Sequence, residues 1–192
     1  MLNRAFLWIV STSLLYANPS LCIDSLSYIY NIKLTLSNYD LPMPIYKKIQ
    51  YESCNLVSIG GNLKLDSVAA EAFFKMKKDA KKDLIEFRVV SAFRSFNHQR
   101  NIINRKLKKG KSIESILKEN TLPGYSEHHT GYAVDFLADG AYSLSVDFEN
   151  TDTFRWLIKN ANRYGFYLSY PKGNKKGIMY EPWHWTFNNN VN

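Results

Sequence analysis

The sequence predicts a single α+β domain with a central antiparallel sheet flanked by helices. The first observation is the size of the chain, which has 192 residues of which 45% are hydrophobic. A chain of this size can bury one hydrophobic core and is too short to indicate two domains. The second is that helical and strand-like stretches mix without the regular strand–helix–strand order of a parallel sheet. No repeat of about 20 to 50 residues is visible, which argues against a solenoid.

The first predicted helix is capped by Asp66 or Ser67, directly after a turn at Gly60 and Gly61, and it continues to about Lys82. Lysines lie mostly off its apolar face. The residues that we expect on its buried stripe are Val68, Ala72, Phe73, Met76 and Ala80.

Further helices are predicted over 97–109, over 112–119 and from residue 151 or 152 to 165. Gly110 and Gly165 end two of them, because glycine readily adopts the left-handed conformation that closes a helix. In the last helix we expect the buried residues to be Phe154, Leu157, Ile158 and Ala161.

The strands are predicted where β-branched and aromatic residues alternate with polar ones. These stretches cover residues 85–93, 131–136, 167–170 and 178–187. They are short and irregularly spaced between the helices, which favours an antiparallel sheet.

The N-terminal region resembles a targeting segment. Residues 1–22 combine one positive charge with an uncharged, mostly apolar stretch, which predicts a secretory signal peptide or a retained membrane anchor. We expect residues 23–59 to form an irregular lead-in and residues 60–188 to form the folded domain that carries the function. Export would permit a disulfide between Cys22 and Cys54, although two unpaired thiols fit the sequence equally well.

The formal net charge is +8 at pH 7, which favours polyanionic surroundings such as nucleic acid, anionic lipid or an acidic wall polymer. The lysines between residues 75 and 82 and between 106 and 111 resemble solvated helix faces, and no nucleic-acid motif accompanies them. We therefore expect no nucleic-acid partner, and attraction to an anionic cell envelope is the more natural use of the charge.

Two short patches contain three of the four histidines, each beside a carboxylate. His128, Asp135 and His184 supply two imidazoles and one carboxylate, the ligand types of an open zinc site with one position left for water. Glu181 lies three residues before His184 and is suited to be the general base. Because His128 and Asp135 are seven residues apart, an uninterrupted strand would direct them to opposite faces, and Gly131 can supply the turn or bulge that brings both to one side.

A third patch, residues 91–95, ends the first predicted strand, and Gln99 follows it. Arg94 in this patch could bind a substrate carboxylate or the oxyanion of a tetrahedral intermediate. Each of these residues, considered alone, could have a purely structural role. Arg94 could form a surface ion pair, and Trp183 could pack in the core or at the edge of the pocket. The joint pattern is what favours a catalytic site.

The three patches resemble the VanY-type zinc D,D-carboxypeptidases of the LAS metallopeptidase group. The matching motifs are Ser-x-His-x-x-Gly-x-Ala-x-Asp at 126–135, Glu-x-Trp-His at 181–184 and Ser-x-x-Arg-Ser at 91–95. Their order and approximate spacing also match, over about residues 60–187. The resemblance implies a small α+β domain with an antiparallel sheet.

The resemblance further implies one Zn²⁺ ion on His128, Asp135 and His184, with Glu181 as the base and Arg94 steadying the substrate or the intermediate. Ser126 and Gln99 match polar positions that bind substrate or shape the site. The implied activity is removal of the terminal D-Ala from peptidoglycan stem peptides. Together with the predicted export signal or anchor at residues 1–22, it leads us to expect a monomer in the periplasm or cell envelope, either secreted or anchored in the membrane.

Three positions depart from the family pattern. His129 stands where Gln is usual, and it could be a competing metal ligand or face solvent, of which solvent exposure is the expectation. Thr186 and Phe187 replace the Arg and Tyr that often follow the last ligand. This replacement leaves the predicted ligands intact, but it removes residues that could support a ligand from its outer side, so that supporting contact is uncertain.

Several alternatives remain open. Relatives of the same fold include L,D-carboxypeptidases and endopeptidases, and loops such as 137–150 would decide between them. A zinc-containing wall-binding domain without catalysis would be expected to lack the base, but Glu181 is present. Ser115 and Lys118 spell the Ser-x-x-Lys signature of serine enzymes, yet its companion motifs are absent, so a chance match is expected.

Overall fold

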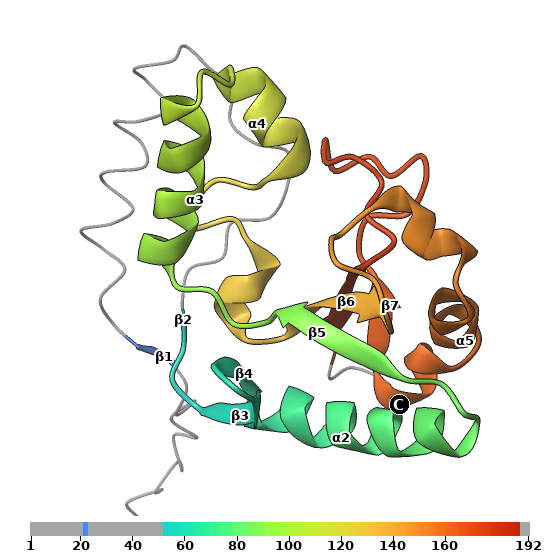
Figure 1. Ribbon diagram of the computed structural model, residues 1–192. Helices are drawn as coiled ribbons and strands as arrows, with labels where there is room; N and C mark the ends of the chain where they lie inside the picture. The colour runs from blue at the N-terminus through green and yellow to red at the C-terminus, as the bar shows by residue number, and fades with distance from the viewer. Residues whose placement is uncertain (1–20, 23–51, 189–192) are drawn as a thin grey trace, which may run out of the picture.

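A computed structural model of the chain describes residues 21–22 and 52–188. At its centre lies a four-stranded sheet with the strand order β5-β6-β8-β7, in which all neighbours are antiparallel (Figure 1). The strands are β5 (Phe87–Ser91), β6 (Ala133–Ala138), β7 (Phe166–Leu168) and β8 (His184–Phe187). The mixed α+β class with an antiparallel sheet is therefore confirmed.

Two small antiparallel pairs precede the sheet. β1 (Leu21–Cys22) pairs with β2 (Glu52–Ser53), and β3 (Leu56–Gly60) forms a hairpin with β4 (Leu63–Asp66). The predicted turn at Gly60 and Gly61 connects this hairpin, and both glycines have positive φ. The lead-in is thus more regular at 52–59 than expected, and its remainder at 23–51 lies outside the described residues, as does the predicted signal or anchor at 1–20.

The first helix, α2 (Ser67–Lys82), begins and ends where the sequence predicts. The carboxylate of Asp66 accepts a hydrogen bond from the backbone N–H of Val68 at 3.2 Å, which caps the helix. The expected burial of Val68 is wrong, since its side chain is 40% exposed and Ala69 lies in the core instead. The buried stripe follows spacings of four, three and four residues from Ala69 through Phe73 and Met76 to Ala80.

Helices α3 (Phe96–Lys108) and α4 (Ile113–Glu119) form a hairpin on the far side of β5 from α2 (Figure 1). Ser95 and Ser112 cap them with their hydroxyl groups. A small cluster of Ile103, Ile113 and Ile116 holds the two helices together, separately from the main core.

The last helix is α5 (Asp152–Asn160), capped by Thr151 and followed by a 3₁₀ turn that ends at Gly165. Leu157 and Ala161 are buried as predicted, whereas the expected burial of Ile158 is wrong, because its side chain is 54% exposed. Trp156, which was not assigned to the core, is buried as well.

The strand expected over 178–187 is confirmed only from His184 onward. Pro182 has no N–H to give to a sheet, and the N–H of His184 donates to the carbonyl of Glu181 in a turn. The strand expected from Gly131 starts at Ala133, because Gly131 adopts a left-handed conformation with φ 71°.

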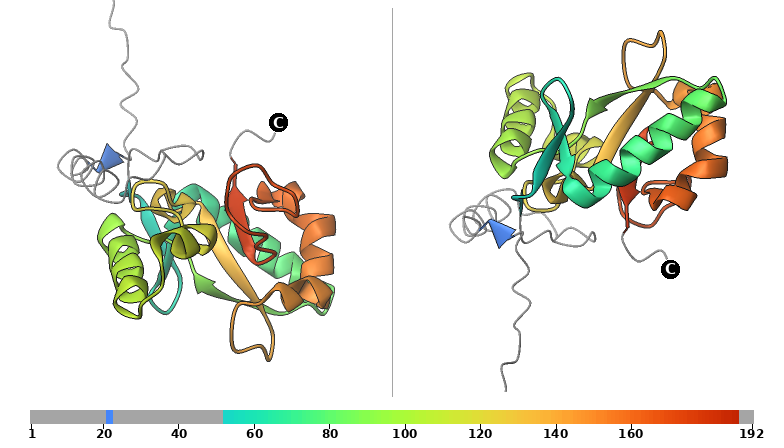
Figure 2. Two further views of the ribbon diagram at one scale, coloured as in Figure 1. Left: turned by 90° about the horizontal axis from the view of Figure 1, so that it is seen from above. Right: turned by 90° about the horizontal axis from the view of Figure 1, so that it is seen from below.

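Alternation along the two central strands separates the core from the site. Val134, Phe136 and Trp185 belong to the main core under α2, which crosses the sheet in Figure 2. Their neighbours Asp135 and His184 point to the opposite face. Among the described helices, none combines the length and apolar character needed to cross a membrane.

Candidate metal centre

The segment that leads into β6 places the first site residues. A 3₁₀ helix, η1 (Glu127–Thr130), ends at Gly131, whose N–H donates to the carbonyl of His128. A Cβ at Gly131 would lie 2.8 Å from the backbone nitrogen of Asp66, so a side chain has neither the conformation nor the space it needs. The predicted turn at Gly131 is therefore confirmed, and it brings His128 to the same side as Asp135.

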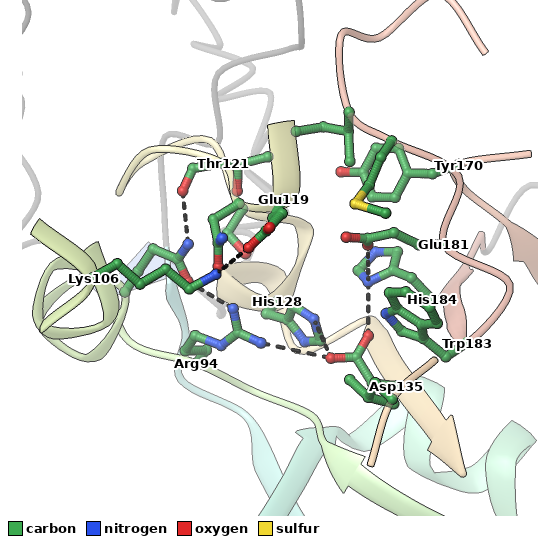
Figure 3. Close-up of a pocket in the computed structure, with 16 residues that line it drawn as sticks. Arg94, Lys106, Glu119, Thr121, His128, Asp135, Tyr170, Glu181, Trp183 and His184 are labelled. Atoms are coloured by element: carbon green, nitrogen blue, oxygen red, sulfur yellow. Dashed lines mark hydrogen bonds and ion pairs between the residues drawn. The ribbon is translucent and has the colours of Figure 1, made fainter. Parts of the chain in front are cut away.

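Three side chains converge on this face of the sheet (Figure 3). Asp135 on β6 and His184 on β8 are directly opposite in the antiparallel register. His128 approaches from η1, and its Nε2 lies 3.2 Å from Oδ2 of Asp135, while Nδ1 of His184 lies 2.9 Å from Oδ1. One ligand atom from each residue lies within 4.8 Å of the others.

Hydrogen bonds on the outer nitrogens orient both imidazoles. Nδ1 of His128 donates to the carbonyl of Ala92 at 2.7 Å, because a carbonyl can only accept. This leaves the lone pair of His128 Nε2 directed at Asp135. On the other ring, Nε2 of His184 lies 3.1 Å from Oε2 of Glu127, so its Nδ1 faces Asp135.

The pKa values of all three side chains are shifted far from their ordinary values. Burial opposes ionisation of Asp135, but its interactions with His128 and His184 outweigh this effect and lower the pKa of Asp135. Burial and the nearby Arg94 charge lower the pKa of His128 to about 4. Burial also opposes the charge of His184, yet its bonds to Asp135 and Glu127 raise its pKa to about 10.

These residues fit a zinc ion. Two buried imidazole nitrogens and one buried carboxylate oxygen converge from three directions, which is the donor set of three-ligand zinc sites. The ionised carboxylate of Asp135 and the neutral ring of His128 are already in the form that binds a metal. His184 would have to give up a proton on binding.

Glu181 lies beside the three predicted ligands, with Oε2 4.0 Å from Nδ1 of His184. Its side chain is nearly buried, and its backbone N–H is held by the carbonyl of Tyr170 at 3.1 Å. Burial raises the pKa of Glu181 to about 7, and Asp135 also raises it while His184 and Arg94 act against the shift. A carboxyl group with this pKa can accept and return a proton near neutral pH.

Arg94 projects into the same pocket. Its Nη1 donates to Oε1 of Gln99 and its Nη2 donates to Oγ of Ser91, both at 2.7 Å. Nη2 also lies 3.6 Å from Oδ2 of Asp135. The amide nitrogen of Gln99 donates to the carbonyl of Thr121 at 2.7 Å, so both ends of this amide are engaged within the protein. Of its two expected roles, the contacts of Gln99 favour shaping the site.

His129 does not face solvent, which corrects the expectation from the sequence. Its side chain is fully buried, with Nε2 accepting from the N–H of Gly124 at 3.1 Å and Nδ1 donating to the carbonyl of Arg94. Burial is the main reason that its pKa is lowered to about 3. One donor and one acceptor are what a glutamine amide would offer here, which explains how His129 can stand in its place.

The predicted site residues line one pocket of about 410 Å³ between the α3–α4 hairpin and the C-terminal segment (Figure 3). Ser126, Arg94 and Gln99 are among its walls, as are Leu144 from the 137–150 loop and Trp183. Lys106 and Glu119, which form an ion pair at 2.8 Å, line its far end. Ser115 and Lys118 are exposed on α4 and do not line this pocket.

Sequence reasoning missed the residues behind His184. Glu127 accepts from Oγ1 of Thr186 at 2.6 Å as well as from His184, and Lys176 lies 3.2 Å from its Oε1. The ring of Tyr170 packs on the ring of His184 with 4.9 Å between centroids. The one available signal was that Glu127 sits beside a predicted ligand.

Comparisons with known proteins agree with this geometry. The family model of the VanY D-alanyl-D-alanine carboxypeptidases matches residues 62–190. The Bacillus subtilis protein YodJ, which is named as a carboxypeptidase, is 38% identical over 123 residues that make up 60% of this chain and 43% of YodJ. The D-alanyl-D-alanine carboxypeptidase of Enterococcus faecalis is 34% identical over 109 residues, or 52% of this chain and 39% of that protein. The chain spans about two fifths of the length of these curated relatives.

Solved structures give the same result. The LdcB LD-carboxypeptidase superposes with a TM-score of 0.65 at 31% identity, covering 71% of this chain and 69% of that one. A mutant of the vancomycin-resistance D,D-pentapeptidase VanY, solved in complex with Zn(II), gives 0.58 at 27% identity, covering 69% and 77% of the two chains. Because the family model covers well over half of the sequence, the chain belongs to the VanY D-alanyl-D-alanine carboxypeptidase family.

Proposed function

We propose that this protein is a zinc-dependent D,D-carboxypeptidase that removes the terminal D-Ala from peptidoglycan stem peptides. The observation that carries the proposal is the convergence of His128, Asp135 and His184 beside Glu181 in one pocket. Family membership supports the reaction class, and relatives solved with Zn(II) or with D-Ala-D-Ala support the cofactor and the substrate. The proposed place of action is the cell envelope, where this substrate is found.

One zinc ion held by His128, Asp135 and His184 would act as a Lewis acid that polarises a carbonyl group and lowers the pKa of water. Glu181 is the proposed general base. Its carboxylate faces the ligands, and a pKa of about 7 lets it take the proton of the attacking water and then pass that proton to the departing amine of D-Ala.

Arg94 is the proposed group that offsets negative charge on the substrate. Its guanidinium is fixed by Ser91 and Gln99 on one side and lies beside Asp135 on the other. A pre-oriented cation contributes most where charge develops as the carbonyl becomes tetrahedral, an effect on the order of 3 kcal/mol for comparable donors. Ser126 remains a proposed substrate contact at the wall of the same pocket.

Cleavage of the L,D bond in stem tetrapeptides is the second candidate. The observation that favours it is the likeness to the LdcB LD-carboxypeptidase, which has the higher TM-score and identity of the two structures compared above. Both reactions would use the same base and the same ligands. The difference must come from the pocket walls, to which Leu144 and Trp183 contribute.

The test is to incubate the zinc-loaded full-length protein with stem pentapeptide and stem tetrapeptide in parallel and to identify the products by mass spectrometry. Loss of one alanine from the pentapeptide alone is the expected result. Loss from the tetrapeptide assigns the L,D reaction instead. If the protein holds one zinc ion and changes neither peptide, both carboxypeptidase assignments are wrong.

Glu181→Ala tests the assignment of the base in the same assay. The variant should keep its zinc ion, because Glu181 is not among the three ligands, and should lose about 10²- to 10⁴-fold in turnover. Turnover close to that of the unmodified protein would show that Glu181 is not the base. Lys175→Met, at an exposed lysine outside the pocket lining, is the matched control and should leave turnover unchanged.

A further inference from the structure

We propose that Lys176, Glu127 and Thr186 form an outer relay that positions His184 for the metal, with Lys176 as its anchor at the protein surface. The proposal rests on the metal site described above and concerns residues that no comparison assigns. The three members are positioning residues, since they act on the metal ligand and do not reach the substrate. They come from three separate segments: η1, strand β8 and the loop after β7.

The inner half of the relay is a set of hydrogen bonds that converge on the carboxylate of Glu127. Oγ of Ser169 donates to Oγ1 of Thr186 at 2.8 Å, and Thr186 in turn donates to Oε2 of Glu127 at 2.6 Å. The same carboxylate oxygen accepts from Nε2 of His184 at 3.1 Å. Because Glu127 accepts from both partners, the imidazole must carry its proton on Nε2, which leaves Nδ1 free to bind a metal.

The outer half supplies a compensating charge. Nζ of Lys176 lies 3.2 Å from Oε1, the second carboxylate oxygen of Glu127. The Glu127 side chain is 21% exposed, so its charge is poorly solvated and needs such a partner.

Lys176 also acts on the face of the His184 ring. Its Nζ lies 5.1 Å from the ring centroid of Tyr170, and the Tyr170 ring packs on His184 with 4.9 Å between centroids. Lys176 therefore contacts both neighbours of the ligand, the carboxylate on its outer nitrogen and the aromatic ring on its face. The same loop continues to Glu181, so Lys176 ties the segment that carries the proposed base to the first motif.

The relay also explains a departure from the family pattern. The sequence puts a contact behind the ligands in doubt, because Thr186 stands where Arg is frequent. In the structure Thr186 donates one hydrogen bond to Glu127 without bringing a positive charge. Lys176, ten positions earlier in the chain, brings that charge from the adjacent loop.

The experiment measures the zinc dissociation constant of the full-length protein by competition with a chromogenic chelator. Lys176→Met should weaken zinc binding by about tenfold, in the range found when an outer partner of a metal ligand is lost. Lys176→Arg should restore most of the affinity, because it keeps the charge. Lys175→Met, at the neighbouring exposed lysine, should bind zinc as the unmodified protein does. Thr186→Val, which removes the inner donor, should weaken binding as well.

The d–d spectrum of the Co²⁺-substituted protein gives a second readout, which a purely structural loss in the loop would not move. Lys176→Met should shift this spectrum, because the geometry of the His184 ligand changes. Zinc affinity within twofold of the unmodified protein together with an unchanged spectrum would overturn the proposal. If all variants bind zinc alike and cleave the stem peptide, the relay fails and the proposed function stands. If zinc affinity follows the relay while no peptide is cleaved, the proposed function fails and the relay stands.

Discussion

The two histidines of the candidate metal centre are oriented by different kinds of partner. His128 is held from behind by a backbone carbonyl, that of Ala92 on the segment after β5. His184 is held by side chains, since Glu127 accepts from its outer nitrogen and Tyr170 packs on its ring. The first arm of the site is fixed by the path of the chain, and the second depends on residues that substitution can change.

This difference indicates which part of the site tolerates changes in sequence. A carbonyl is present whatever residue occupies position 92, so the orientation of His128 is insensitive to sequence there. The support of His184 needs a carboxylate, a hydroxyl donor and a nearby cation, and different residues can supply them. The departures from the family motif at Thr186 and Phe187 lie on this second arm.

The largest expected effect comes from removing either ligand. His128→Ala and His184→Ala should each lose zinc far beyond the 10- to 100-fold that loss of an outer partner costs. Metal analysis of the purified, dialysed variants checks this. If one variant keeps a full zinc ion, the histidine substituted in that variant is not a metal ligand, and the comparison of the two histidines no longer applies.

The next effect concerns Arg94, which lies between the arms beside Asp135. Arg94→Ala should keep zinc and lower kcat by about 10²- to 10³-fold, as expected for loss of a preorganised group that stabilises developing charge. Steady-state kinetics with the cleaved stem peptide measures it. Arg100→Ala, at an exposed arginine of α3, is the control, and an equal loss there would count against a specific role for Arg94.

Gly131→Ala tests the turn that places the first arm. Gly131 and Gly140 both have positive φ, at 71° and 75°, but only Gly131 has another backbone within 2.8 Å of the missing Cβ. Gly140→Ala should cost about 1–2 kcal/mol, the ordinary penalty of a left-handed residue. Gly131→Ala should cost more than this in urea unfolding, and equal losses would show that the close approach to Asp66 relaxes freely.

The smallest expected effect is a pH dependence of stability at His129. Its pKa is about 3 in the folded protein and about 6.5 in an unfolded chain, so the folded state binds fewer protons between these values. The stability it contributes is therefore complete above pH 6.5 and is lost as the pH falls toward 3. His129→Gln offers the same donor and acceptor without titrating.

Urea unfolding of the metal-free proteins at pH 7 and pH 4.5 measures the difference. The variant should lose about 2 kcal/mol less than the unmodified protein on acidification. Equal losses would show that the proton on His129 does not affect folding. The metal-free form is used because acid also releases the metal, which would lower stability for a reason unrelated to His129.

The sequence predicted the positions of helices, because these depend on local features such as capping residues and the spacing of apolar residues. Helix α2 was placed correctly because Asp66 caps it and its apolar residues recur with helical spacing, yet Val68 and Ile158 were assigned to the core although both are exposed. Such one-residue shifts of a helix face depend on how the helix docks, which periodicity alone does not fix.

Contacts between distant segments were beyond the sequence. Glu127 and His184 are 57 residues apart and meet only because η1 lies next to β8. The burial of His129 likewise depends on the backbone of Arg94, 35 positions away. The predicted ligands and the base converge as expected because short motifs carried them, whereas their supports are scattered along the chain.

The register of the sheet has a consequence for cooperativity. Asp135 and His184 are opposite residues on the two central strands, so their spacing is set by the same ladder that holds the core together. They form the last pair of this ladder, so separating them requires the end of the β6–β8 pairing to open. Metal binding across this pair would stabilise the paired form of β6 and β8, by about 1.4 kcal/mol for each tenfold rise in free metal above its dissociation constant.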